Sequence, residues 1–320
     1  MFAKSFSSLD MSRCPLAIRE ALEFLRPKPS PWPLMRIGGA RDGAYLVPEN
    51  LEGIVACFSP GVRNSKAFED ELLVNNGMRS HLMDFSSSPE LFLTPLVDGT
   101  QTFQKKWLAA DTDDVSLSMA DWINLTEPDT EGDFLLQIDI EGAEWSILPF
   151  LPVEILKRFR IIVIELHKLD DIFSDPNLFA SKAEGVFSLL KENFTVVHAH
   201  PNNCCGRSKN LFSSGMRIPR TLEITMVRSD VHEQALASAK ALPPELPHPL
   251  DIVANVPSSP PIFLGSGWRS SSPTMRTVWS ITLLQLRYEL LWRWKRLIPQ
   301  NAYRSYRKLI SQRGADTRLL

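Results

Sequence analysis

Several features that would assign this chain of 320 residues to a familiar class are missing from it. The N-terminal stretch MFAKSFSSLDMSRC lacks the long apolar run of a secretory signal peptide. No run of about 20 apolar residues is present to cross a bilayer. The patterns G-x-G-x-x-G and G-x-x-x-x-G-K-[ST] are both absent, which argues against nicotinamide or flavin cofactors and against hydrolysis of ATP or GTP.

Cysteine is scarce as well, with four residues at Cys14, Cys57, Cys204 and Cys205. Their spacing matches no zinc site, and the adjacent pair cannot easily form a disulfide within an ordinary backbone. We therefore expect reduced thiols in a cytoplasmic protein. A chain of this length buries enough apolar surface to be stable without disulfides or a structural metal.

Charge is unevenly distributed along the chain. From Gly265 to the C-terminus, eleven Lys and Arg residues face only Glu289 and Asp316, a net charge of +9. Because the whole chain carries −2, residues 1–264 carry −11. An acidic body repels phosphate groups, so we expect no nucleic-acid partner.

The pattern along the chain predicts four segments: a leader over 1–35, a region of alternating strands and helices over 36–229, a proline-rich linker over 230–264, and a basic, Trp-rich helical tail over 265–320. Short apolar runs predict strands at 54–58, 81–85, 134–140, 160–167, 194–200 and 221–228. Amphipathic stretches predict helices near 15–25, 65–75 and 179–193. This alternation indicates an α/β fold with a mostly parallel sheet, and the seven prolines between Pro243 and Pro261 indicate an extended linker rather than packed structure.

Ligands of open parallel sheets bind beyond the carboxyl ends of the strands, so the residues that follow each apolar run are the candidates for a site. Those residues are Ser59 and Gly61, then Asp84, then Asp139, Glu141, Gly142 and Glu144, then Glu165 and His167, then His198 and His200. Asp139 adjoins a run that should be buried, where a carboxylate without a partner is costly. Asp84 lies 23 residues after Gly61, a separation that suits a carboxylate on a ribose hydroxyl but also an ordinary turn residue. Each histidine pair is compatible with a structural or a functional role.

The segment LLQIDIEGAEWSIL at 135–148 resembles the signature of FkbM-type methyltransferases. Other matches follow in the order of that family, in RIGGARDGAYLVP, ACFSPGVRNSKAFEDEL, HLMDF, IVIELH and HAHPNN with PRTLEIT, and together they cover residues 36–228. The resemblance implies a Rossmann-like, doubly wound, mostly parallel seven-stranded sheet of the class I methyltransferase type. It also implies S-adenosylmethionine as cofactor and a hydroxyl of a sugar, glycan or small-molecule metabolite as acceptor.

The resemblance further implies roles for individual residues. Ser59 and Gly61 would line the methionine end of the cofactor, Asp84 would hold its ribose, Asp42 and Gly43 would lie near its edge, and Asp139 would face the sulfonium and the acceptor. The family usually has a second glycine where this chain has Arg63. Arg63 would then hinder the cofactor or pair with its carboxylate, and the first outcome would leave a non-catalytic scaffold.

Two mechanisms remain open from the sequence. His167 or Asp139 would act as general base on the acceptor hydroxyl. Alternatively Asp139, Glu165 and His167 would hold magnesium or manganese, which lowers the pKa of that hydroxyl. The helical stretch 275–297 of the tail has two interpretations, an interfacial helix on the inner face of an anionic membrane or a helix packed against protein.

Overall fold

A seven-stranded sheet forms the centre of the computed structural model, which describes residues 11–297 except 41, 206–208, 252–254, 257–258 and 269–274. Its strands, in spatial order, are β10 (Phe194–Asn202), β13 (Thr221–Arg228), β9 (Phe159–Leu166), β8 (Asp133–Ile138), β3 (Ile54–Pro60), β4 (Arg79–Met83) and β5 (Gln101–Gln104). Neighbours in this sheet are parallel except β13, which runs antiparallel to both β9 and β10. The predicted fold class is therefore confirmed as an α/β, Rossmann-like, doubly wound sheet.

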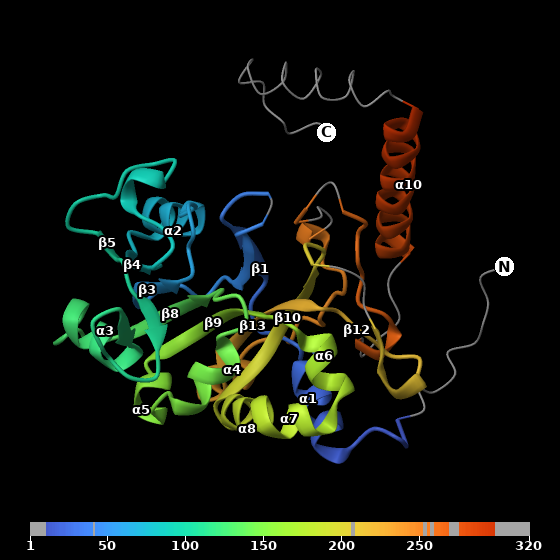
Figure 1. Cartoon of the computed structure of the whole chain (residues 1–320), viewed down its shortest axis with the longest axis horizontal. Coiled ribbons are helices and arrows are strands. Elements are labelled where there is room, and N and C mark those ends of the chain that lie inside the picture. Colours follow the sequence, from blue (N-terminus) through green and yellow to red (C-terminus); the bar gives the residue numbers. More distant parts are fainter. Residues whose placement is uncertain are drawn as a thin grey trace.

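Helices cover both faces of this sheet (Figure 1). One face is covered by α1 (Leu16–Leu25), α4 (Glu144–Ile147), α5 (Val153–Leu156), α6 (Leu169–Ser174), α7 (Pro176–Lys182) and α8 (Glu184–Asn193). The other face is covered by α2 (Ala67–Asn76), α9 (Ser229–Leu236) and the hairpin of β1 (Leu34–Ile37) and β2 (Tyr45–Pro48). Buried residues of α3 (Met119–Thr126) belong to the core on the first of these faces. So do residues of the short pairs β6 (Trp107–Ala109) with β7 (Ser116–Ser118) and β11 (Lys209–Asn210) with β12 (Arg217–Ile218).

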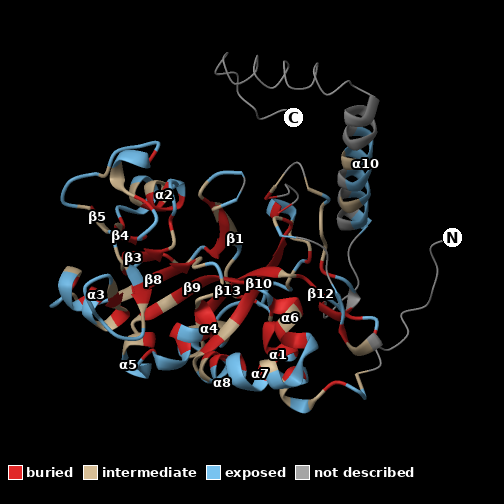
Figure 2. Ribbon diagram, in the orientation of Figure 1, coloured by how far each residue is buried: buried red, intermediate tan, exposed pale blue. Residues whose placement is uncertain are grey.

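Alternation along the central strands explains why both faces are covered. Leu135 belongs to the core under α2 and the next residue, Leu136, to the core under α8; Ile161 and Ile162 alternate in the same way. Both cores appear as a buried layer on either side of the strands in Figure 2. Each fully buried side chain of this kind contributes about 1.5–3 kcal/mol through the hydrophobic effect. Continuous apolar runs are therefore what a sheet buried on both faces requires.

Two features of the structure differ from the prediction. The helix predicted over 179–193 is divided at Ala183 into α7 and α8, although both halves keep their buried face. Strand β5 was not predicted, because its sequence QTFQ is polar and it lies at the edge of the sheet beside β4.

The segment predicted as an extended linker packs on the body in its described residues. It begins with α9, and Leu242 forms a two-way backbone bridge with Ser30. Farther along the segment, Leu246, Asp251 and Leu264 are buried. The expectation of an unpacked linker is therefore wrong for these residues, because prolines restrict the backbone without preventing side-chain burial. The four segment boundaries themselves stay predictions.

The predicted tail helix is present as α10 (Met275–Leu297), which projects away from the sheet (Figure 1). Trp279, Leu283 and Leu290 on it are more than half exposed. No helix among the described residues is long and apolar enough to cross a membrane. Residues 298–320 of the tail lie outside the described residues, and both interpretations of the tail stay predictions.

Candidate functional site

A cavity of about 400 Å³ lies where the carboxyl ends of β3, β4 and β8 meet. The connection that leaves β3 passes through α2 on one face of the sheet, and the connection that leaves β8 passes through α4 and α5 on the other face. Such a divergence marks the usual ligand position in doubly wound folds. Five of the residues predicted to contact the cofactor line it, namely Asp42, Gly43, Gly61, Asp84 and Asp139. The volume falls in the range of small-molecule and cofactor pockets.

Gly61 directly follows β3 in a conformation that only glycine adopts readily. Its φ is +91°, and a Cβ at this position would lie 1.7 Å from the carbonyl oxygen of Asp139. The Asp139 N–H donates to the Pro60 carbonyl at 3.2 Å, so the turn is held directly against the end of β8. A glycine is therefore required for the loop to pass between the two strands.

Asp84 organises the two loops that bound the cavity. Its Oδ2 accepts the backbone N–H of Arg63 at 2.7 Å, and its Oδ1 accepts both the N–H and the hydroxyl of Ser86, each at 2.7 Å. A carboxylate offers about four accepting positions, so Oδ2 keeps one for a ligand hydroxyl. Arg63 takes a φ of 50°, in the left-handed region that favours glycine. Arg63 therefore takes a backbone conformation that glycine adopts readily.

Ser59 does not reach the cavity, contrary to the role that the resemblance implied. Its side chain is fully buried, and its Oγ lies 3.3 Å from Sγ of Cys57. Residues two apart on a strand face the same side, and Cys57 belongs to the core under α2. Ser59 therefore packs in the core beneath the loop and does not line the cavity.

Sequence reasoning missed several residues of the cavity wall. Glu69 on α2 is buried there, and burial raises the pKa of its carboxyl to about 7 while a hydrogen bond from Ser59 opposes the shift. Gln137 Nε2 donates to the hydroxyl of Tyr45 at 3.2 Å, and Trp107 stacks on Phe85 at the exposed edge. In the sequence, Glu69 is indistinguishable from an ordinary helix charge and Trp107 follows an unpredicted strand.

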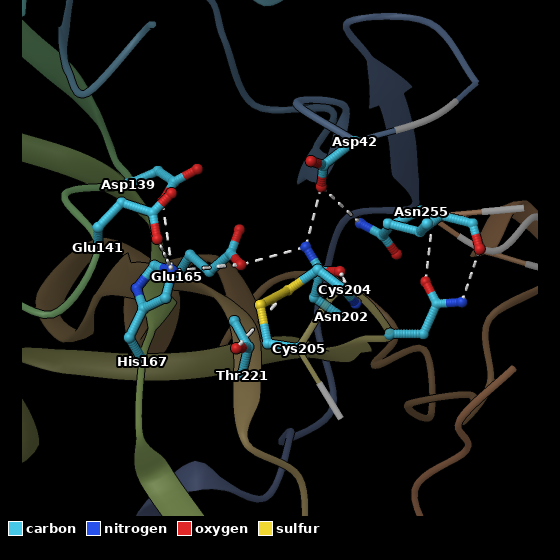
Figure 3. Close-up of a disulfide and its surroundings, with 12 residues drawn as sticks. Asp42, Asp139, Glu141, Glu165, His167, Asn202, Cys204, Cys205, Thr221 and Asn255 are labelled. Atoms are coloured by element: carbon cyan, nitrogen blue, oxygen red, sulfur yellow. Dashed lines mark hydrogen bonds and ion pairs between the residues drawn. A yellow bond between two sulfur atoms is a disulfide. The ribbon is translucent and has the colours of Figure 1, made fainter. Parts of the chain in front are cut away.

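Beside the cavity, the structure brings together Asp139, Glu165 and His167, as predicted (Figure 3). His167 Nε2 lies 3.6 Å from Asp139 Oδ1, 3.6 Å from Glu165 Oε1 and 3.6 Å from Glu141 Oε2. On the other side of the ring, Nδ1 lies 2.8 Å from Oε1 of the fully buried Glu144. Because a carboxylate only accepts, Nδ1 carries the proton and Nε2 faces the three carboxylates.

Burial and mutual repulsion shift the protonation of this group. Burial raises the pKa of Asp139 to about 7; the His167 ring opposes that shift and Glu141 adds to it. Burial raises the pKa of Glu165 well above its usual range, and the nearby Asp139 acts in the same direction. Burial lowers the pKa of His167, but the hydrogen bond to Glu144 and the surrounding carboxylates outweigh it, so the pKa is raised. Each of these groups therefore influences the protonation of the others.

A second acidic group, Asp42 with Glu165 and Glu223, is held by amides. Asn202 Nδ2 donates to Asp42 Oδ1 at 2.9 Å and to Glu165 Oε1 at 3.1 Å. Asn255 Nδ2 donates to Glu223 Oε1 at 2.6 Å. Hydrogen bonds therefore join these carboxylates to β10 through Asn202 and to the proline-rich segment through Asn255.

The pair His198 and His200 serves a structural purpose. His198 Nε2 lies 2.6 Å from Asp251 Oδ2, and His200 Nδ1 lies 3.5 Å from the same oxygen. Arg36 pairs with Asp251 Oδ1 at 3.0 Å. Neither histidine lines the cavity, and the network attaches the proline-rich segment to β10.

The cysteines differ from expectation at one place. Cys204 and Cys205 form a disulfide in the turn that follows β10, whereas Cys14 and Cys57 are free and buried. The Cys204 N–H donates to Asn202 Oδ1 at 2.9 Å, which places this turn beside the second acidic group (Figure 3). The expectation of reduced thiols is therefore wrong for this pair, whose two sulfur atoms are bonded to each other in this turn.

Similarity to known proteins is found among solved structures. No family model matches the chain, and no curated protein matches it. Among solved structures, it is similar to a chain of the fibrillarin/Nop5p complex, with a TM-score of 0.31 and 16% sequence identity. That similarity covers 56% of this chain and 74% of the other.

Proposed function

We propose that this chain is an S-adenosylmethionine-dependent methyltransferase that methylates a hydroxyl oxygen of a sugar, glycan or small-molecule metabolite, as its resemblance to the FkbM-type family implies. The observation that carries this proposal is the Gly61 turn beside a cavity of cofactor size. The turn passes too close to Asp139 for any other residue, and Asp84 bounds the same cavity. These residues lie at the switch point of the sheet, where the general rule for such folds places a nucleotide.

The residues around the cavity fit this cofactor. Asp84 Oδ2 keeps an accepting position for a ribose hydroxyl. Trp107 lines the cavity and presents an aromatic face for a purine base. Arg63, which lines it too, carries a charge that complements the carboxylate of the methionine part. S-adenosylmethionine, when bound, supplies a methyl group that is already activated for transfer.

The chain's own residues have to align the acceptor and take up its proton. Alignment contributes several kcal/mol to reactions of this kind. Asp139 lies both in the cavity wall and beside His167 Nε2, so the acceptor hydroxyl would lie between the cofactor and this group. Glu144 holds the His167 ring in place, and the Trp145 indole N–H donates to the His167 carbonyl at 2.9 Å.

The alternative of a non-catalytic scaffold depended on damage to the loop by Arg63. The φ of 50° at Arg63 and its hydrogen bond to Asp84 describe a loop that is intact in spite of the substitution. These two observations favour the enzyme over the scaffold.

Isothermal titration of the full chain with S-adenosylmethionine tests the proposal. We expect one binding site in the wild type and a loss of about tenfold to a hundredfold in affinity for Asp84→Asn, because a hydrogen bond to a charged acceptor contributes about 1.5–3 kcal/mol. Asp98→Asn, the same change at an exposed position outside the cavity wall, should bind like the wild type. Circular dichroism checks that both variants fold. If the wild type binds no S-adenosylmethionine at high micromolar concentration, the scaffold replaces the enzyme.

A further inference from the structure

His167 faces its three carboxylates without a hydrogen bond on Nε2 among the described residues. Its side chain is only 8% exposed, and buried polar atoms in native proteins are almost always paired. Asp139 Oδ1, one of the three facing oxygens, is also buried and has no hydrogen-bond partner within the described part of the chain. Two polar atoms without hydrogen bonds thus face each other across 3.6 Å.

The charges of this group are unbalanced. Asp139, Glu141 and Glu165 supply three carboxylates, and no lysine or arginine within the described part of the chain forms an ion pair with them. Placing like charges this close raises the free energy, and either protonation of a carboxylate or a cation between the carboxylates lowers it again. A positively charged ligand would therefore remove this repulsion without protonation.

The environment of the His167 ring is the arrangement that metal-binding histidines usually have. Metal-ligating histidines almost always donate their second ring N–H to a carboxylate or carbonyl, which fixes the tautomer and directs the other nitrogen at the ion. Here Nδ1 donates to Glu144 Oε1 at 2.8 Å, and Glu144 is completely buried. This hydrogen bond is independent of the carboxylates on the other side of the ring.

The dimensions fit a small divalent ion. The ligand atoms of Asp139, Glu141 and His167 all lie within 4.8 Å of one another. An octahedral ion with ligands at about 2.1 Å separates them by about 3.0 Å or about 4.2 Å. The 3.6 Å contacts to Nε2 lie between these values, so small side-chain movements would complete the site.

We propose that Asp139, Glu141 and His167 bind one divalent cation, Mg²⁺ or Mn²⁺. Two carboxylates and one imidazole form a ligand set dominated by hard oxygen donors, which suits these ions better than zinc. Because Asp139 and Glu141 also line the cavity, the remaining coordination positions face the acceptor. The cation would lower the pKa of the acceptor hydroxyl. This role rests on the proposed function, but the binding of the cation itself is independent of that function.

The second acidic group provides a comparison inside the same molecule. Asp42, Glu165 and Glu223 also lie within 4.8 Å of one another, but amide donors from Asn202 and Asn255 bond all three carboxylates. Those oxygens already have partners, and the cluster contains no imidazole ligand among the described residues. A cation at the second group would have to replace hydrogen bonds that are already formed, whereas Asp139 Oδ1 beside His167 has no partner among the described residues. We therefore assign the ion to the group around His167.

Titration of the full chain with Mn²⁺ alone, followed by electron paramagnetic resonance, tests the proposal. We expect one bound Mn²⁺ and at least a tenfold loss of affinity for Glu141→Gln. The Glu141 side chain is 79% exposed, so this variant should fold normally. Glu90→Gln, at an exposed carboxylate elsewhere, is the matched control and should bind Mn²⁺ like the wild type.

Pulsed resonance on the bound Mn²⁺ should further show coupling to one imidazole nitrogen, absent in His167→Gln. A histidine with a purely structural role would not produce that coupling. Wild-type protein that binds no Mn²⁺ while still binding S-adenosylmethionine would overturn the cation site and leave the proposed function standing. Protein that binds Mn²⁺ with equal affinity in wild type and Glu141→Gln would also overturn it.

Discussion

Gly61→Ala should lower the free energy of unfolding more than most glycine-to-alanine substitutions in the described part of the chain. The added Cβ would lie 1.7 Å from the Asp139 carbonyl oxygen and 3.2 Å from Cγ2 of Ile140, at a φ of +91°. Ordinary contact begins near 3.4 Å, so the backbone of β3 or β8 must move by well over an ångström. The positive φ costs about 1–2 kcal/mol and the overpacking about 1–3 kcal/mol, which together give about 2–5 kcal/mol.

Urea unfolding followed by circular dichroism measures this loss, and Gly77→Ala is the matched control. Gly77 ends α2 with a φ of +64°, and a Cβ added there would meet nothing within 4 Å, so only the backbone cost of about 1 kcal/mol applies. Gly61→Ala should therefore unfold at a clearly lower urea concentration than Gly77→Ala. Equal midpoints for the two variants would refute the close approach of the loop to β8.

Three further predictions concern residues around the site. Because the pKa of Glu69 is raised to about 7 in the fold, the stability that Glu69 contributes should be fully present below pH 4.5 and be lost, by up to about 3 kcal/mol, as pH rises through 7. In urea titrations at pH 5 and pH 8, Glu69→Gln should reduce the difference in unfolding free energy between the two pH values, and the part due to Asp139 and Glu165 should remain. Arg63→Val should cost about 1–2 kcal/mol because a β-branched residue is strained at a φ of 50°, while Arg63→Asn should be neutral by the same assay. Asp251→Ala should cost about 3–5 kcal/mol by removing the shared partner of Arg36 and His198, and a thermal midpoint like that of wild type would contradict the network.

Much of the sheet could be predicted because its strands are buried on both faces. Continuous apolar runs mark β8 and β9, and β13 matches its predicted bounds of 221–228. Strand β5 could not be predicted in this way, since an edge strand with the sequence QTFQ buries little apolar surface. The break between α7 and α8 could not be predicted from the sequence either, because the apolar residues of both helices fit one continuous amphipathic helix.

The convergence of Asp139, Glu165 and His167 followed from one rule, that the carboxyl ends of parallel strands meet at the same edge of the sheet. The partner that fixes the His167 ring did not follow, because Glu144 approaches it from the first turn of α4. The face of β3 on which Ser59 lies could not be predicted either. All residues from Ala56 to Pro60 are buried, so their sequence does not show which of them point towards the cavity.

The docking of the proline-rich segment could not be predicted for a related reason. His198 and Asp251 are 53 residues apart, and their 2.6 Å contact depends on the path of the chain after α9. The composition of such a segment predicts an extended linker. The segment packs on the body because buried polar residues of β10 form hydrogen bonds with it.

Hydrogen–deuterium exchange of the full chain with and without S-adenosylmethionine tests the central claim most directly, since it reports both binding and its location. The account predicts added protection of backbone amides in the loops that bound the cavity, at 61–65, 84–87 and 106–108. Residues around Cys204 and along α10 should exchange at unchanged rates, because they lie outside the cavity wall. Unchanged exchange in all three loops at saturating S-adenosylmethionine, or protection confined to other segments, would contradict the account.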